Sequence, residues 1–211
     1  ASGIYIVEPD EAGVVQRFGA YAYQTGPGPH YHLPFPIETV KTPKVSQVRR
    51  VEVGFRSSSR DGMTTQSRVV PEESLMLTGD ENIVDVQFIV QYQISNPVDY
   101  LFKVDRPDET VKSAAEAAMR EVIGDAKIDT VLTSGKVTVQ DDTKKVLQSM
   151  LQRYGCGVEV VAVQLQDVHP PKQVVDAFKD VASAREDKIR FINEADAYAN
   201  DILPKARGQA A

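Results

Sequence analysis

The feature that most constrains the fold is an alternation of apolar and polar residues across Ile83–Ile94. Every second position is apolar, at Val84, Val86, Phe88, Val90, Tyr92 and Ile94. A period of two over this length predicts a β-strand with one face in the core and one polar face. Leu75–Leu77 and the polar connection at residues 79–82 precede it, which predicts a hairpin that ends in this strand.

The apolar period then becomes helical, after Asn96-Pro97 closes the strand. Asp105 as a cap and Pro107 in the first turn predict a helix that ends at Gly124. A second helix is predicted over residues 139–154, with Gly155 as its terminator. A further strand is expected over residues 158–165. Together these segments predict an α/β region.

The first third of the chain reads as β-rich. Strands are expected over residues 3–7, 13–18, 38–44 and 47–55. Residues 26–36 contain four prolines, which remove donors and exclude a helix or a central strand, so an extended loop is expected there. Residues 56–70 are polar and serine-rich, and we expect a mobile loop.

The last predicted helix opens at Pro170-Pro171 and ends near Pro204. Steps of three and four give a weak heptad seam, consisting of Val175, Phe178, Ala182, Arg185, Ile189, Ile192, Asp196, Ala199 and Leu203. This pattern favours a helix that packs on other chains, and the alternative is a long surface helix on its own core. The residues expected to carry assembly are Phe178, Ala182, Arg185, Glu186, Ile189 and Ile192. The charges beside the seam set partner choice in the first case and are simply solvated in the second.

Seven segments in order resemble the SPFH (stomatin/prohibitin, band 7) family across nearly the whole chain. They are residues 11–19, 26–30, 76–84, 90–94, 114–124, 167–171 and 184–188. The resemblance implies an α+β fold in three parts. A β-rich, membrane-proximal subdomain would cover residues 1–72, an α/β subdomain residues 73–169, and the start of a long coiled-coil-type assembly helix residues 170–211.

The resemblance also implies a non-catalytic scaffold of the bacterial inner membrane. A single-pass anchor is expected before residue 1, with the domain on the periplasmic face. The implied partners are an HflC-like subunit, in a large hetero-oligomeric ring, and the AAA+ protease FtsH, which the ring modulates. Two alternatives stay open, a stomatin-like homo-oligomer that organises lipid without FtsH and an accessory subunit of a hydrolase.

In this family the proline-rich loop lies at the membrane surface, where apolar tips enter the headgroup region. Tyr31, Leu33 and Phe35 are therefore the residues expected to contact lipid. The alternative is that these three side chains fill their own sheet.

Charge and residue types argue against other functions. The formal charge of −6 does not suit a nucleic-acid binder, which needs a basic surface. The sequence contains only His30, His32 and His169 as histidines, too few and too scattered to predict a metal site. Cys156 has no histidine near it in sequence, and the acidic pairs 72–73, 80–81 and 141–142 fall where acids cap or solvate. No catalytic residue and no cofactor are expected.

Overall fold

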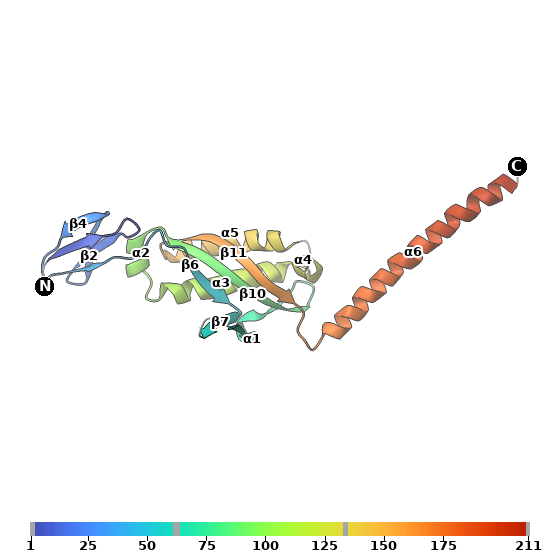
Figure 1. Ribbon diagram of the computed structural model, residues 1–211, viewed down its shortest axis with the longest axis horizontal. Coiled ribbons are helices and arrows are strands. Elements are labelled where there is room, and N and C mark those ends of the chain that lie inside the picture. The colour runs from blue at the N-terminus through green and yellow to red at the C-terminus, as the bar shows by residue number, and fades with distance from the viewer. Residues whose placement is uncertain (1–2, 61–63, 133–134, 210–211) are drawn as a thin grey trace. The chain divides into compact units, whose positions relative to one another are not determined.

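The computed structural model describes residues 3–60, 64–132 and 135–209 of the 211-residue chain (Figure 1). The chain divides into two compact units, Ala1–His169 and Pro170–Ala211. Within these ranges, the first unit holds strands β1 to β11 and helices α1 to α5, and the second holds α6.

The N-terminal layer consists of five short strands, β1 (Ile4–Val7), β2 (Gly13–Arg17), β3 (Ala20–Thr25), β4 (Gly28–Tyr31) and β5 (Glu38–Lys41). They form two antiparallel sheets, β1-β4 and β3-β2-β5. β4 corrects the expectation of a loop over residues 26–36. Pro29 is tolerated in it because β4 pairs with one strand, so one side of its backbone needs no donor.

The turn between β2 and β3 has two residues, Phe18 and Gly19, both with positive φ (50° and 86°). Two positive φ angles in a two-residue turn match the twist of a hairpin. A phenylalanine rarely adopts this conformation. Phe18 nevertheless sits there with its ring in solvent.

The second sheet contains β6 (Arg49–Val53), β9 (Leu75–Leu77), β10 (Ile83–Ile94) and β11 (Val158–His169). β10 is central, with β11 on one side and β6 and β9 on the other, all antiparallel. The six alternating apolar side chains of β10 are all buried, namely Val84, Val86, Phe88, Val90, Tyr92 and Ile94, which confirms the predicted alternation. The Ile83–Leu77 pairing confirms the predicted hairpin, and β11 runs four residues past its predicted end.

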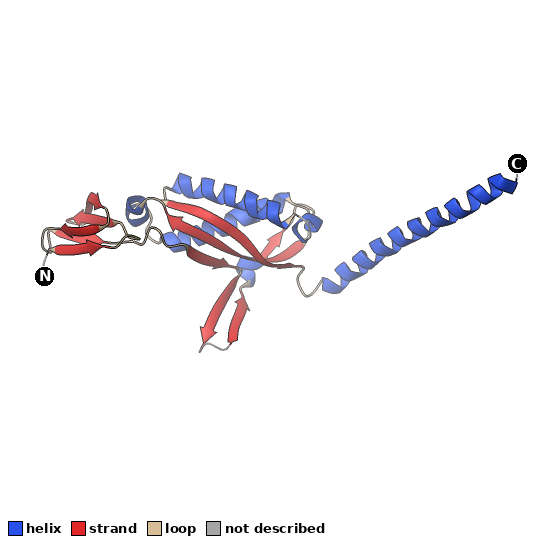
Figure 2. Ribbon diagram, turned by 45° about the horizontal axis from the view of Figure 1, so that its top comes forward, coloured by secondary structure: helices blue, strands red, loops and turns tan. Residues whose placement is uncertain are grey.

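Helices cover the core face of this sheet (Figures 1 and 2). They are α3 (Pro107–Asp125), α4 (Ile128–Leu132) and α5 (Lys136–Tyr154), while α2 (Pro97–Phe102) lies at the end of the sheet, toward β3. α3 continues through Gly124 instead of ending there, whereas Gly155 ends α5 with a φ of 65°, as predicted. α2 was not predicted, although Asn96 is a good cap whose side chain accepts from the backbone of Val98 and Asp99.

Residues 56–70 contain a hairpin, which corrects the expectation of a mobile loop. β7 (Phe55–Arg60) and β8 (Thr64–Val69) pair from Phe55–Val69 to Arg60–Thr64, and α1 (Pro71–Ser74) follows. The hairpin extends away from the sheet in Figure 2. Gly54 allows this change of direction because its φ is 84° and a Cβ there would lie 2.7 Å from the Val86 carbonyl oxygen. The serine- and threonine-rich composition of residues 56–70 gave no indication that the two halves of this segment pair as strands.

α6 (Val175–Gln209) is a single helix of 35 residues. It begins later than predicted, because Pro170 and Pro171 lie in the connection, where Val174 N–H donates to the Pro171 carbonyl at 3.0 Å. It also passes Pro204, where the sequence predicts its end. A proline removes one backbone donor, and that loss does not stop this helix.

Candidate membrane-facing and assembly surfaces

Glu38 organises the connection between β4 and β5. Its carboxylate is buried and accepts the Leu33 N–H at 2.8 Å. Arg17 donates to it through two nitrogens, at 2.8 and 3.1 Å, and Tyr23 donates at 3.4 Å. The Leu33 N–H and then Arg17 hold the pKa of Glu38 below its usual value, so the carboxylate stays charged. Glu38 fixes the backbone next to Leu33, and no motif in the sequence indicated this role.

The two neighbouring histidines have local partners in the N-terminal layer. The rings of His30 and His32 lie 5.6 and 5.5 Å from the ring of Tyr5. Each also bonds a backbone carbonyl at 2.7 Å, Gly26 for His30 and Leu33 for His32. Both rings therefore help to order the proline-rich segment.

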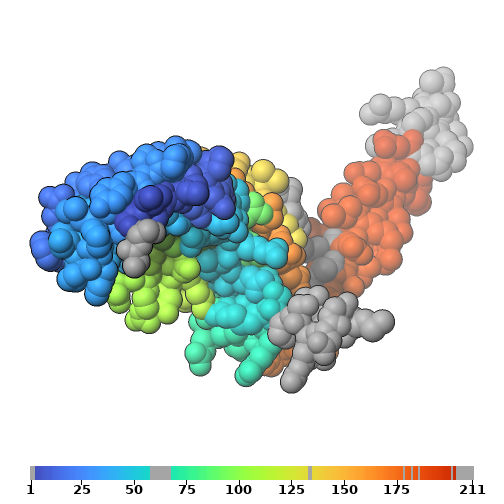
Figure 3. Space-filling model, turned by 60° about the vertical axis from the view of Figure 1, so that its left-hand side comes forward, coloured from blue at the N-terminus to red at the C-terminus, as the bar shows by residue number. Residues whose placement is uncertain are grey.

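The three residues expected to contact lipid are all in solvent. The relative exposures of Tyr31, Leu33 and Phe35 are 63%, 40% and 76%. They do not share one strand face, because β4 ends at Tyr31 and the chain then turns over residues 34–37. The layer that carries them is the blue part of Figure 3.

More exposed apolar side chains surround these three residues. Ile4 pairs with Tyr31 and Ile6 with Pro29, so the two isoleucines and Tyr31 share one face of the β1-β4 sheet. Phe18 donates its N–H to the Ile37 carbonyl at 3.0 Å, which brings its turn beside residues 34–37. All of them have exposed side chains. We name Ile4, Ile6, Phe18, Tyr31, Leu33, Phe35 and Ile37 the apolar rim. Ile4 and Ile6 stand at alternate positions of β1, and this spacing is the sequence signal that could have placed them on the same surface.

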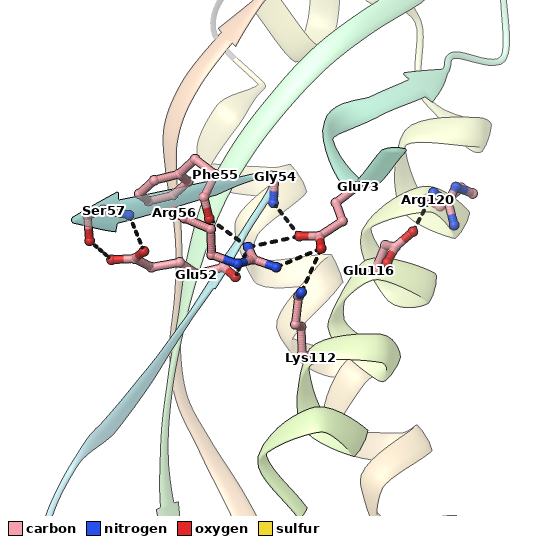
Figure 4. Close-up of polar contacts among 9 residues, drawn as sticks. All are labelled: Glu52, Gly54, Phe55, Arg56, Ser57, Glu73, Lys112, Glu116 and Arg120. Carbon is pink, nitrogen blue, oxygen red and sulfur yellow. Dashed lines mark hydrogen bonds and ion pairs between the residues drawn. The ribbon is translucent and has the colours of Figure 1, made fainter. Parts of the chain in front are cut away.

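A charged cluster fixes the base of the β7-β8 hairpin to α3 (Figure 4). Glu73 accepts two hydrogen bonds from the Arg56 guanidinium, at 2.7 and 3.0 Å, and one from Lys112 Nζ at 2.6 Å. The Gly54 N–H also donates to Glu73, at 3.3 Å. On the far side of Arg56, Ser57 donates its N–H and its hydroxyl to Glu52. One carboxylate thus joins the hairpin, α1 and α3.

The charge of Glu73 depends on these partners. Burial alone would raise its pKa, but the hydrogen bonds from Arg56, Lys112 and Gly54 outweigh burial and lower the pKa to about 2. Glu73 is therefore a structural anion. The sequence placed it in an acidic pair without assigning its partners.

Helix α6 carries the residues expected in assembly. Ile189, Ile192 and Glu186 are exposed, while the side chains of Phe178, Ala182 and Arg185 lie outside the described part of the structure. A second stripe with the same three-and-four spacing contains larger exposed side chains. It consists of Val181, Ala184, Lys188, Phe191, Ala195, Tyr198 and Ile202. We name it the α6 stripe. The predicted seam follows the neighbouring frame of the same spacing and therefore does not include these residues.

The cysteine and the acidic residues that were candidates for catalysis are either buried or bonded to neighbouring groups of the fold. Cys156 is fully buried, and burial raises the pKa of its thiol. Asp80 accepts from Thr78 at 2.6 Å and from the Ile128 N–H at 3.1 Å, and Asp142 pairs with Lys145 at 2.9 Å. Across residues 3–60, 64–132 and 135–209, no three acidic, histidine or cysteine side chains gather as metal ligands. Within the same ranges no helix has the length and apolarity to span a bilayer.

The SPFH domain / Band 7 family matches residues 5–199, so this chain belongs to that family, as its sequence segments indicated. Three bacterial relatives are called HflK. They are 41% identical in Treponema pallidum (strain Nichols), 39% in Vibrio cholerae serotype O1 and 36% in Escherichia coli (strain K12). The E. coli protein bears the name "Modulator of FtsH protease HflK".

The similarity to the HflK proteins covers this chain from end to end. The matches span 100%, 99% and 100% of this chain, and 64%, 48% and 45% of the T. pallidum, V. cholerae and E. coli relatives. The chain therefore spans about half to two thirds of the length of these relatives. Among the segments that resemble the family, residues 76–84 and the last helix favour HflK over HflC or stomatin. These relatives confirm the resemblance to HflK.

Proposed function

We propose that this chain is the SPFH region of a membrane-associated scaffold subunit that modulates the protease FtsH. The observation that carries the proposal is its end-to-end similarity to HflK proteins, one of which is named for that activity. The subunit acts without catalysis of its own. It assembles with an HflC-like partner into a ring or cage and controls which substrates reach the protease.

The apolar rim supports contact with lipid. Tyr31, Leu33 and Phe35 extend from a segment that Glu38 holds in place, so these tips are presented without a large ordering cost. Exposed aromatic and aliphatic side chains gain free energy in the headgroup region, where their apolar parts leave water. Such a concentration of exposed apolar residues marks an interaction surface.

α6 supports assembly. A helix of 35 residues spans roughly 50 Å at about 1.5 Å per residue. Both the predicted seam, with Ile189 and Ile192, and the α6 stripe leave large apolar side chains in solvent. Helices of this kind become stable by packing against similar helices. The subunit would therefore join its neighbours along α6.

The whole protein would carry an anchor ahead of residue 1 and expose this region on the periplasmic face of the inner membrane. The relatives are longer than this chain, which leaves room for an anchor and for a segment that closes the ring. The second candidate is a stomatin-like homo-oligomer that organises lipid without FtsH, because the family match is common to both classes.

The test is electron microscopy of the gently extracted whole protein, expressed alone and with an HflC-like partner. We expect closed rings only with the partner, and we expect FtsH to co-purify with them. Rings without partner and without FtsH would favour the stomatin-like candidate. Small particles under both conditions would reject the scaffold proposal.

A truncation tests the role of α6 separately. Removal of residues 184–211 should leave a folded monomer, because α6 belongs to a compact unit of its own and the buried apolar residues that the structure describes lie in the unit Ala1–His169. Circular dichroism checks the fold and analytical ultracentrifugation the mass. Rings formed by the truncated protein would contradict assembly through α6.

A further inference from the structure

The outer edge of β11 carries a row of side chains where a neighbouring strand would bond. Among the strands that the structure describes, β11 pairs with β10 alone and is therefore a sheet edge. Gln140, Lys144 and Gln148 follow at intervals of four along α5, which places them on one face of that helix. All three reach backbone groups of β11.

Gln148 imitates the backbone of an adjacent strand. Its Oε1 accepts the Val160 N–H at 2.7 Å, and its Nε2 donates to the Val158 carbonyl at 3.4 Å. A neighbouring strand in an antiparallel sheet offers the same acceptor and donor to one side of its partner. The carboxamide thus occupies the place of a peptide group.

The other two side chains continue the row along the strand. Lys144 Nζ donates to the Val161 carbonyl at 2.8 Å, and Gln140 Oε1 accepts the Leu165 N–H at 2.9 Å. The row therefore satisfies four backbone groups between Val158 and Leu165. All four of these hydrogen bonds end on backbone atoms of β11.

The covered edge has the composition of a self-pairing strand. Residues 158–164 contain four valines, one alanine, one glutamine and a single charged residue, Glu159, with no proline. High β-propensity and low charge on an edge strand favour pairing with an identical strand. An open groove of about 510 Å³ borders Val158–Val160 between α5 and Asn96, so this edge is reachable from solvent.

We propose that Gln140, Lys144 and Gln148 form an edge guard that prevents strand addition by a second copy of this chain. Two identical edges would pair antiparallel about a two-fold axis, which matches β11 meeting β11. With the guard in place, the incoming strand must displace side-chain hydrogen bonds to gain backbone ones. The inference is independent of FtsH and of assembly through α6.

The test replaces both amides with methionine, Gln140→Met and Gln148→Met together, which keeps side-chain length and helix propensity. Hydrogen exchange is measured on the 211-residue chain at low and high protein concentration. At low concentration, the amides of Val160 and Leu165 should exchange at least about tenfold faster than in the parent. At high concentration, added self-association should protect the same two amides again.

Gln152→Met is the matched control, since it adds the same apolar group one turn along α5 while all the bonds described above remain. Protection of Val90 in the central strand verifies that the double variant stays folded. Unchanged exchange at Val160 and Leu165 would overturn the inference. So would equal self-association of the control, or association that leaves both amides unprotected.

Discussion

The N-terminal layer and the α/β region use apolar side chains in opposite ways. In β10 the large apolar residues are inside, and Phe88 has no exposed surface. In the layer of β1 to β5 both phenylalanines are outside, with Phe18 77% and Phe35 76% exposed. The small sheets of the layer are ordered partly by polar contacts such as those of Glu38. Burial thus stabilises one region, while exposure in the other leaves apolar surface available for binding.

The largest expected effect is a loss of stability in the α/β region, where the large apolar side chains are buried. Phe88→Ala should destabilise the fold by about 3–5 kcal/mol, because it removes a buried ring from the central strand and leaves a cavity. Phe35→Ala is the matched control and should change stability by less than about 0.5 kcal/mol. Urea unfolding of both variants measures the difference. Equal losses would mean that the two regions do not differ as described.

The second effect concerns the charged group in the buried region. Glu73→Gln should destabilise the protein by about 2–3 kcal/mol at neutral pH, since Arg56 and Lys112 lose their anion. The folded-state pKa of about 2 lies below the usual value of 4.5, so this stabilisation is complete above pH 4.5. It should disappear as the pH falls from about 4.5 toward 2.

The pH dependence separates the charge of Glu73 from its packing. The difference in unfolding free energy between parent and Glu73→Gln should shrink over that acidic range. Asp142→Asn serves as a control, because Asp142 pairs with one exposed lysine on the surface of α5. A difference that stays constant from pH 6 to pH 3 would show that the charge of Glu73 contributes nothing.

The smallest expected effect is a loss of lipid binding by the N-terminal layer, where apolar side chains are exposed. The triple variant Tyr31→Ser, Leu33→Ser and Phe35→Ser should bind liposomes about tenfold more weakly while keeping its thermal stability. Flotation with vesicles of neutral and anionic lipid measures this binding. Val137→Ser, which removes an exposed apolar side chain from α5, should have no effect. Undiminished binding by the triple variant would contradict the membrane role of the loop.

Periodic segments were predicted well because burial alone determines them. The alternation in β10 and the terminator Gly155 needed no knowledge of distant partners. The β7-β8 hairpin could not be predicted, since its base depends on Glu73 meeting Lys112, 39 positions away in the chain. β4 was not predicted because its segment is rich in proline, which a strand accommodates only at a sheet edge. The continuation of α6 past Pro204 shows that a breaker residue predicts a local cost and leaves the end of a helix undetermined.

The residues of the candidate surfaces also divide into those that local sequence predicts and those that depend on strand register or helix frame. Tyr31, Leu33 and Phe35 were found because they lie in one unusual segment. Ile4 and Ile6 join that surface through strand register, which the sequence does not specify. On α6 two stripes with the same spacing compete, and the exposed Phe191 and Tyr198 lie on the one that was not chosen.

The burial of Cys156 has a practical consequence for spectroscopy. It is the sole thiol of the chain, has no exposed surface and is poorly ionised at neutral pH. Thiolate is the reactive species, so this residue will react slowly with maleimides and nitroxide reagents. A cysteine placed at Val161 or Phe191 would then be the only fast-reacting position. Labels for fluorescence or electron-spin distance measurements can therefore be attached to the native background without first removing a cysteine.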